Sequence, residues 1–521
     1  MAEYKDKHFQ RRLSDAKARK ANWNNLLDQC YDLFLPDRQT IYTQEKGNDR
    51  RINLFDSTGC NALQEFANNL KQMLLPSNEV WGELKPGMDL DVLKESGAID
   101  KDQFDEVGRE LSIANKILFR YIWQSNFDQS VHESIQDMAI STGAMMITDT
   151  GDPSNPLNFE SIPANEFYLE SDKNVFREHK VTAREIYELF PTAEKDSEID
   201  KVIKENPNEK LDLCELTEWV FKDKNYYYTV YVKKSERKVF FKANYQESPW
   251  VVFRANVSPG EIMGRGPAIK SLPDMRTLNQ LSAQMLRNND MAVNPPLITN
   301  ETAGGLDISN ININPGSILP TAPDMTTGNQ RPYEYLQTGA SFQTGLMAVD
   351  QYQKSIERSF QLPQLGDIDR GAKTATEISI RNAQALSQQA ALFGRLNTEL
   401  VQKIIKRCYS IVKNYNALLP SDLELNGNRI SIVSSSPLSK VQKQKDTEST
   451  LNFMNLAMSM GEPGQAMIAT TLKVGEIGTY LADSMGVPVD LKLSEDEKKK
   501  QQEAMEQAAM QAQQGGMDGT Q

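Results

Sequence analysis

The sequence predicts an α+β protein that is mainly helical and elongated, and three observations carry this prediction. Much of the chain repeats its apolar residues at helical spacing, whereas residues 157–170 and 211–257 alternate in the manner of strands. An apolar stripe from Leu386 to Tyr415 predicts one helix over residues 374–419, about 67 Å long at ~1.5 Å per residue. Such a helix is too long for an ordinary globular domain, so we expect an extended subunit.

Helices are expected to dominate the first 146 residues. The first is predicted over residues 3–36, where the apolar spacing is helical and Pro36 ends the run. A second begins at residues 56–58 and stops before Pro76. Residues 102–146 predict one or two more, with an apolar face that contains Leu111, Ile117, Phe119, Trp123 and Ile135.

The middle of the chain has the texture of a sheet. Residues 225–232 and 239–245 are rich in Tyr, Phe and Val and are separated by polar loops, which predicts an antiparallel meander. Between the two strand-like regions, Thr182 and Glu185 have the spacing of a capping box, so a short helix is expected from there to Pro191.

Two helices and an irregular insertion follow. A helix is predicted over about 267–291 and ends at Asn294-Pro295-Pro296, and a second is predicted over about 343–361. The residues between them, 297–340, show no period and hold many Gly, Pro and Asn residues. Because a structureless stretch of this length is unusual in a compact domain, we interpret it as a small β-rich projection.

A loop over residues 362–373 precedes the long helix, which Thr374-Ala375-Thr376-Glu377 caps. The loop carries two cations and two carboxylates, which are Arg370, Lys373, Asp367 and Asp369. It is interpreted either as a surface turn or as a mobile loop that touches a polyanion. Further helices are predicted over about 440–460 and 464–484. The tail, 494–521, is rich in Gln, Met and Ala, and is expected to be disordered or packed against copies of itself.

Composition restricts the class of protein. Acidic residues number 71 against 58 basic ones, a formal net charge of −13, which argues against a protein that grips nucleic acid over its whole surface. DNA passing beside an acidic wall is still compatible with it. No apolar run approaches the ~18 residues that a membrane span needs, and the polar N-terminus predicts no secretory signal. The four cysteines are too far apart for metal or disulfide motifs and are expected to be buried thiols: Cys30, Cys60, Cys214 and Cys408.

No motif indicates catalysis. The Gly-rich residues 259–267 precede a helix as a phosphate-binding loop does, but no Gly-Lys-Ser/Thr follows and Pro267 lacks an amide hydrogen, so a tight turn is favoured. The three histidines, His8, His132 and His179, have no metal-ligand spacing. His179 is either a general base or, as we favour, a structural histidine. We expect no enzymatic activity, no cofactor and no metal ion.

Several short segments, in their order along residues 20–420, resemble one known family. They are Asn22-Trp23, Leu35-Pro36, Asp56-Ser57-Thr58-Gly59, Phe167-Tyr168-Leu169-Glu170, Arg177-Glu178-His179-Lys180, Ser258-Pro259-Gly260-Glu261, Gly264-Arg265-Gly266-Pro267, Leu272-Pro273-Asp274, Leu278-Asn279, Asn294-Pro295-Pro296 and Thr374-Ala375-Thr376-Glu377. Together they resemble the portal proteins, or head–tail connectors, of short-tailed bacteriophages (podoviruses).

The resemblance implies a homo-oligomeric ring, in this family a dodecamer, at the head–tail vertex of the virion and made in the host cytoplasm. Double-stranded DNA would pass through its channel during packaging and ejection. Terminase, tail adaptor proteins, the major capsid protein and scaffold protein would be its partners, and no membrane is implied.

In the family's terms, the chain divides into a wing, a stem, a clip, a tunnel loop and a crown. The resemblance assigns them as wing 1–265, stem helix 266–294, clip 295–340, stem helix 341–361, tunnel loop 362–373, long wing helix and strand 374–435, crown helices 436–493 and flexible tail 494–521. Arg370, Lys373, Asp367 and Asp369 would then be the residues that face DNA.

Two other functions stay open at the level of sequence. One is an enzyme of nucleic-acid metabolism whose metal ligands are scattered along the chain, and the other is a multi-helix adaptor scaffold. Electron micrographs of the purified protein distinguish them, because a ring with a central hole supports only the portal.

Overall fold

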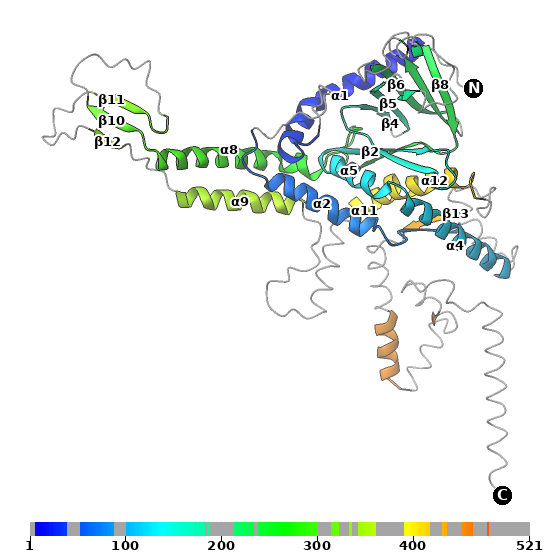
Figure 1. The fold of residues 1–521 in the computed structure, drawn as a ribbon. Helices are drawn as coiled ribbons and strands as arrows, with labels where there is room; N and C mark the ends of the chain where they lie inside the picture. The colour runs from blue at the N-terminus through cyan, green and yellow to red at the C-terminus, as the bar shows by residue number, and fades with distance from the viewer. Residues whose placement is uncertain are drawn as a thin grey trace, which may run out of the picture.

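The computed structural model describes residues 6–38, 53–87, 101–171, 173–182, 185–186, 199–200, 204, 213–223, 226–233, 238–300, 314–321, 333–335, 342–360, 390–416, 430–434, 450–461 and 477–478. These form a mixed helix-and-strand body from which a pair of helices projects to one side (Figure 1). The predicted α+β class and elongated shape are therefore confirmed.

Four helices form the N-terminal part of the body. They are α1 (Asp6–Phe34), α2 (Thr58–Leu74), α4 (Lys101–Gln124) and α5 (Phe127–Ile140). The first two confirm the predicted helices. The prediction for residues 102–146 is wrong at its end, because the helix stops at Ile140 and a strand follows. It is also wrong for Trp123, which is 46% exposed rather than part of the buried face.

A three-stranded antiparallel sheet lies at the centre of the body. Strand β2 (Thr142–Asp149) pairs with β3 (Leu157–Ser161) on one side and with β9 (Trp250–Arg254) on the other. The first six residues of β2 are buried. A strand that is buried on both faces has no polar alternation, so its sequence is read equally well as the end of a helix.

A second sheet confirms the predicted meander. Its order follows the chain: β4 (Phe167–Ser171), β5 (Asn174–Thr182), β6 (Leu213–Asp223), β7 (Tyr226–Lys233) and β8 (Lys238–Tyr245), all antiparallel. Strand β5 was not expected, because its charged residues mask the alternation. At its end, the Thr182 amide donates to Glu185 at 3.2 Å and the Glu185 amide donates to Thr182 at 3.4 Å, so the capping box is confirmed. Most of the helix predicted after it lies outside the described residues.

Helix α1 covers one face of the meander. Its apolar residues Phe9, Leu13 and Ala16 pack against Phe176, Trp219 and Val230, which are register partners on β5, β6 and β7 and so share that face. Three cations reinforce the contact: Arg12 pairs with Glu170, Lys17 pairs with Glu178, and the buried Lys20 donates to the Ala164 and Phe167 carbonyls. Apolar burial and these ion pairs together fix α1 to the sheet.

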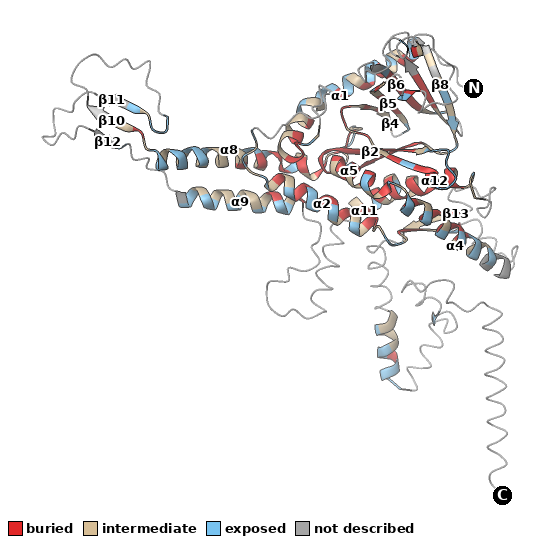
Figure 2. Cartoon of the chain, viewed as in Figure 1, coloured by how far each residue is buried: buried red, intermediate tan, exposed pale blue. Residues whose placement is uncertain are grey.

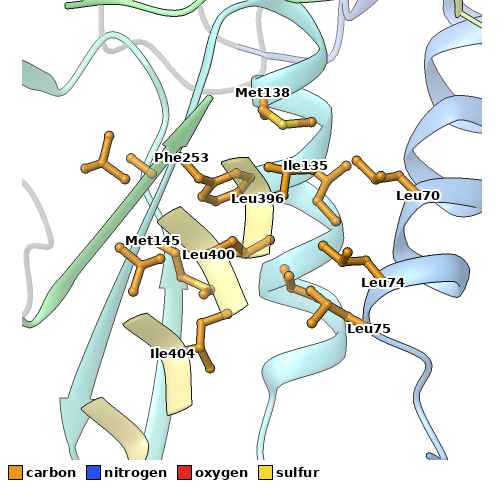
Figure 3. Close-up of a cluster of buried hydrophobic side chains, with 14 of the residues drawn as sticks. Leu70, Leu74, Leu75, Ile135, Met138, Met145, Phe253, Leu396, Leu400 and Ile404 are labelled. Atoms are coloured by element: carbon orange, nitrogen blue, oxygen red, sulfur yellow. The ribbon is translucent and has the colours of Figure 1, made fainter. Parts of the chain in front are cut away.

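The main core lies between α2, α5, the central sheet and the long helix (Figure 3). Leu70 and Leu74 from α2 and Ile135 and Met138 from α5 contribute to it, and all four side chains are almost fully buried. On the other side of this core lie the apolar residues of the long helix, Leu396, Leu400 and Ile404. The body thus has one main apolar core, and the contact between α1 and the meander forms a second, smaller one.

The long helix differs from its prediction. Its described part is α11 (Ala390–Leu396), a π-helix η3 (Asn397–Val401) and α12 (Gln402–Val412). The helix ends at Val412 and a turn follows, so the predicted extension to residue 419 is wrong. Residues 374–389 lie outside the described part. A two-stranded sheet of β1 (Gly82–Pro86) and β13 (Ile430–Ser434) includes the strand predicted near the end of this region.

The remaining predictions are tested only partly. Residues 450–459 are helical, within the range predicted as 440–460, whereas most of 464–484 and all of 494–521 lie outside the described residues. Cys30 and Cys408 are buried free thiols, as expected, but Cys60 is only half-buried. No helix among the described residues is long and apolar enough to cross a membrane.

Candidate functional site: the projecting helix pair

Two helices and a small sheet project from the body, and we call them the arm. Helix α8 (Pro267–Val293) runs outward and α9 (Phe342–Phe360) returns beside it (Figure 1). At the tip, β10 (Leu297–Asn300) pairs parallel with β11 (Ile318–Thr321) and antiparallel with β12 (Tyr333–Tyr335). Both predicted helices and the β-rich projection between them are confirmed.

The Gly-rich turn before α8 is a structural element. The amide of Gly266 donates to the Ile140 carbonyl at 2.9 Å, and the amide of Gly264 donates to the Thr142 hydroxyl at 2.9 Å. The Arg265 amide donates to the Asn256 carbonyl at 2.7 Å. Because these three amides are bonded within the protein, they do not form a phosphate cradle, which agrees with the interpretation as a tight turn.

Polar side chains fasten the base of the arm to α2 and the segment before it. Asn279 of α8 donates to the Asn53 carbonyl at 2.8 Å and accepts from the Phe55 amide at 2.7 Å. Asp56 accepts from the Thr58 amide at the start of α2 and from Gln353 of α9 at 3.1 Å. Both arm helices are therefore bonded to the same short segment of the body.

Apolar packing completes this base. The ring of Phe360, at the end of α9, lies with its centre 5.6 Å from that of Phe34 and 6.1 Å from that of Phe66. A Cβ atom on Gly59 would come within 2.9 Å of the Met275 sulfur and of the Phe34 ring. Close packing of this kind holds the direction in which the arm leaves the body.

The outer half of the arm is exposed (Figure 2). In α8 every buried residue precedes Asn279, and in α9 the buried residues are Ile356 and Phe360 at its end. Beyond the base the two helices pack on each other, as where a Cβ atom on Gly345 would lie 3.4 Å from the Met285 sulfur. Among the described residues, the outer halves of α8 and α9 thus pack against each other and not against the body.

Large apolar side chains are concentrated on this exposed part. Six of the twelve exposed large hydrophobic residues in the described part of the chain belong to the arm: Leu286, Val293, Ile318, Tyr335, Leu346 and Met347. Met347 is 73% exposed and Val293 is 71% exposed. A surface of this composition is typical of a contact with another protein.

The loop predicted to touch DNA is not part of the described structure. Arg370, Lys373, Asp367 and Asp369 all lie outside the described residues. His179 lies on β5, and burial lowers its pKa to about 3, so it is neutral and has the properties of a structural residue. Among the described residues no group of His, Cys, Asp and Glu could hold a metal ion.

Sequence reasoning missed how the base of the arm is built. Apart from the helix start at residues 56–58, Asp56, Gly59, Asp274 and Asn279 were noticed only as pieces of a resemblance. All four contribute to the base of the arm, where the Ser355 hydroxyl also donates to Asp274 at 2.7 Å. The one available signal was that these residues are polar or small within otherwise apolar helical patterns. That signal does not say which of them pair.

Comparison with known proteins identifies the class. The family described as "Bacteriophage head to tail connecting protein" matches residues 6–492. A "Probable portal protein" of Bordetella phage BPP-1 is 21% identical over 544 residues, covering 96% of this chain and 92% of that protein. The chain belongs to the bacteriophage head-to-tail connecting protein family, which confirms the predicted resemblance.

Two solved structures are also similar, at 10% identity each. The match to "Neck of empty GTA particle computed with C6 symmetry" covers 79% of this chain and 89% of the matched chain, with a TM-score of 0.33. The match to "Virion of native gene transfer agent (GTA) particle" covers 91% of this chain and 99% of the matched chain, with a TM-score of 0.36. TM-scores this low establish no shared fold.

The family match settles the class of function. The chain is a head–tail connector, a structural component of the phage virion at the head–tail vertex. A structural role is consistent with the expectation that the chain is not an enzyme.

Proposed function

We propose that this chain is a portal protein that forms a closed ring, twelve copies in a dodecamer, around a channel for double-stranded DNA. The ring sits at the capsid vertex, beside the major capsid protein, and assembles there with scaffold protein. Terminase drives DNA in through the channel, tail adaptor proteins dock afterwards, and the genome leaves by the same route. Family membership and the exposed apolar arm support this proposal.

The exposed apolar arm is the main observation that supports a ring. A single helical pair that projects into solvent with Leu286, Leu346 and Met347 exposed has too little packing of its own. Side-by-side copies would cover these residues, and a heterologous contact that repeats around an axis closes into a ring. In this arrangement α8 and α9 are the stem and the β10–β12 sheet is the clip that faces the terminase and the tail.

The charge of the stem bears on how DNA slides. The two helices carry nearly balanced charges: Lys270, Arg276, Arg287, Lys354 and Arg358 against Asp274, Asp290, Asp350 and Glu357. The acidic excess of the chain is thus not on these helices. A stem-lined channel would be close to neutral, so DNA would pass without strong attraction or repulsion.

The experiment targets the exposed apolar face of α9. Leu346→Ser combined with Met347→Ser should reduce the ring to smaller species while the body stays folded, because both side chains are exposed in the single chain. Gln343→Ser with Gln351→Ser is the matched control, since these residues are exposed and polar on the same helix. Native mass spectrometry gives the copy number and circular dichroism reports folding.

The outcomes are distinct. A ring in the native and control proteins and its loss in the apolar variant supports the proposal. A native protein that is monomeric at micromolar concentration contradicts the ring, and an intact ring in the apolar variant contradicts the stem as its interface.

A further inference from the structure

We infer that the ion pair between Arg254 and Glu399 is a latch that couples the π turn of the long helix to the loop from which the arm emerges. Glu399 lies in η3, and Arg254 is the last residue of β9, directly before that loop. The register of the long helix and the position of the arm's entry loop would therefore change together.

The π turn is a local widening of a continuous helix. The amide of Gln402 donates to the carbonyl of Asn397, five residues earlier, whereas an α-helix bonds four residues earlier. The residues on both sides, Leu396 and Gln402, have α-helical backbone angles. The π turn thus contains one residue more than an α-helical turn, and the helix continues through it.

The buried stripe of the helix accounts for the wide turn. Leu396, Leu400, Ile404 and Cys408 follow at intervals of four residues, and all are fully buried. Each four-residue step in an α-helix overshoots a full turn by about 40°, so an α-helical stripe would rotate away from the core. A wider turn at residues 397–401 reduces the rotation and keeps the stripe facing Phe253 and the rest of the core (Figure 3).

Glu399 then reaches Arg254 with both carboxylate oxygens. Oε2 accepts from the Arg254 backbone amide at 3.0 Å and from Nε at 3.2 Å, and Oε1 accepts from a terminal guanidinium nitrogen at 2.8 Å. The side chain of Arg254 is 7% exposed and that of Glu399 is 15% exposed. A charge-assisted, bidentate pair shielded from water is strong and geometrically specific.

Arg254 also holds the loop that enters the arm. Its other terminal nitrogen donates to the Ile262 carbonyl at 2.9 Å, and its Cβ and Cγ atoms occupy the space beside Gly264. Gly264 is three residues before Pro267, where α8 begins. One guanidinium thus bonds the π turn on one side and the entry loop on the other.

On this proposal the π turn has two states. In the latched state, which the structure shows, the Arg254–Glu399 pair and the buried stripe together hold the π register. Without the pair, the turn would gain the ordinary four-residue bonds of an α-helix, and residues 390–396 would rotate about the helix axis. Two sites are physically coupled when both favour the same one of two packings of a shared element. Here the sites are the π turn and the loop before α8, and the shared element is the Arg254–Glu399 pair.

Hydrogen exchange measured by mass spectrometry on the full-length protein tests the latch. In Glu399→Ala, amide exchange should rise at least tenfold in residues 255–266 as well as in 390–401, with a smaller rise in Glu399→Gln. Arg12→Ala is the matched control, because it removes an Arg–Glu pair between α1 and β4. It should leave exchange in residues 255–266 unchanged.

A deletion separates register from the loss of a charge pair. Removing Asn397 takes out the inserted residue, so the turn becomes α-helical while the helix on either side keeps its place and Arg254 and Glu399 both remain. Residues 255–266 should stay protected in this variant, because the pair can still form. Full protection of 255–266 in Glu399→Ala, or its loss in the deletion, would overturn the proposal. So would a rise of equal size across the whole body, because the pair would then support only global stability.

Discussion

The indole N–H of Trp250 on β9 donates to Oε1 of Glu218 on β6 at 3.0 Å, which joins the central sheet to the meander through a buried carboxyl group. Beside it, Arg177 of β5 pairs with Glu160 at 2.6 Å and with Glu166 at 2.9 Å. Two carboxylates thus pair with the Arg177 guanidinium, and Glu218 lies opposite Arg177 on the neighbouring strand. Burial raises the pKa of Glu218 to about 7, against the opposing effect of Arg177.

The raised pKa of Glu218 predicts a pH-dependent stability. Between its ordinary pKa of 4.5 and about 7, the folded protein holds a proton on Glu218 that the unfolded chain releases. The contribution is therefore fully present below pH 4.5 and is lost as the pH rises to about 7. Glu218→Gln should remove this part of the slope, worth at most about 3 kcal/mol since one pKa unit is ~1.36 kcal/mol. Denaturant unfolding from pH 5 to 8 measures it.

Glu160→Gln is the control for this prediction, because Glu160 pairs with the same Arg177 but its side chain is 43% exposed. The control should keep most of the native slope, because Glu160 is a smaller cause of the raised pKa of Glu218 than burial is. An unchanged slope in Glu218→Gln would show that Glu218 is ionised throughout the range.

Lys20 predicts a slope of the opposite sign at higher pH. Burial lowers its pKa to about 7, although Glu178 and Glu166 oppose the shift. Between about 7 and 10.5 the unfolded chain binds the extra proton, so the contribution of Lys20 to stability rises with pH in this window and is lost as the pH falls. Lys20→Met should flatten the rise measured by thermal unfolding from pH 7 to 9.5. Lys17→Met, at a half-exposed ion pair, should keep it.

Gly266 is a position at which a single methyl group should be costly. A Cβ atom there would collide with the backbone of Ala139, and a backbone segment at the centre of the core cannot give way. Gly266→Ala should lower the free energy of unfolding by about 2–4 kcal/mol. Gly394→Ala should instead raise it by up to about 1 kcal/mol, because a Cβ atom built on that helical glycine would meet no other atom within 4 Å. Equal stability of the two variants in denaturant unfolding would contradict the packing argument.

The DNA-contact hypothesis for Arg370 and Lys373 remains a prediction. Arg370→Ala with Lys373→Ala should leave ring assembly and thermal stability nearly unchanged but alter the length of DNA packaged or retained. Each contact would be solvated and worth on the order of 1 kcal/mol or less, which suits a sliding path. Normal assembly with normal packaging would reject DNA contact, and lost assembly would place the loop in an interface. Asp367→Asn with Asp369→Asn controls for altered loop charge.

The type of most elements was predictable because it depends on local periodicity. Helices α1, α2, α8 and α9 and the β6–β8 meander each show their apolar period within a few turns or residue pairs of sequence. Strand β2 was misread as a helix since it is buried on both faces, and β5 was missed because charged residues that pair inside the protein look like solvent-exposed ones. In both cases the partner, and not the segment itself, decides the structure.

The sequence by itself determined the class of fold, the helices α1, α2, α8 and α9, the β6–β8 meander and the connector family. Only the tertiary structure decided that β1 pairs with β13 across most of the chain, that Asn279 and Asp56 hold the base of the arm, and that the long helix widens where Glu399 meets Arg254. The reason is physical. A period is written in consecutive residues, whereas a buried ion pair or a clamp depends on groups far apart in sequence that become neighbours only when the core closes.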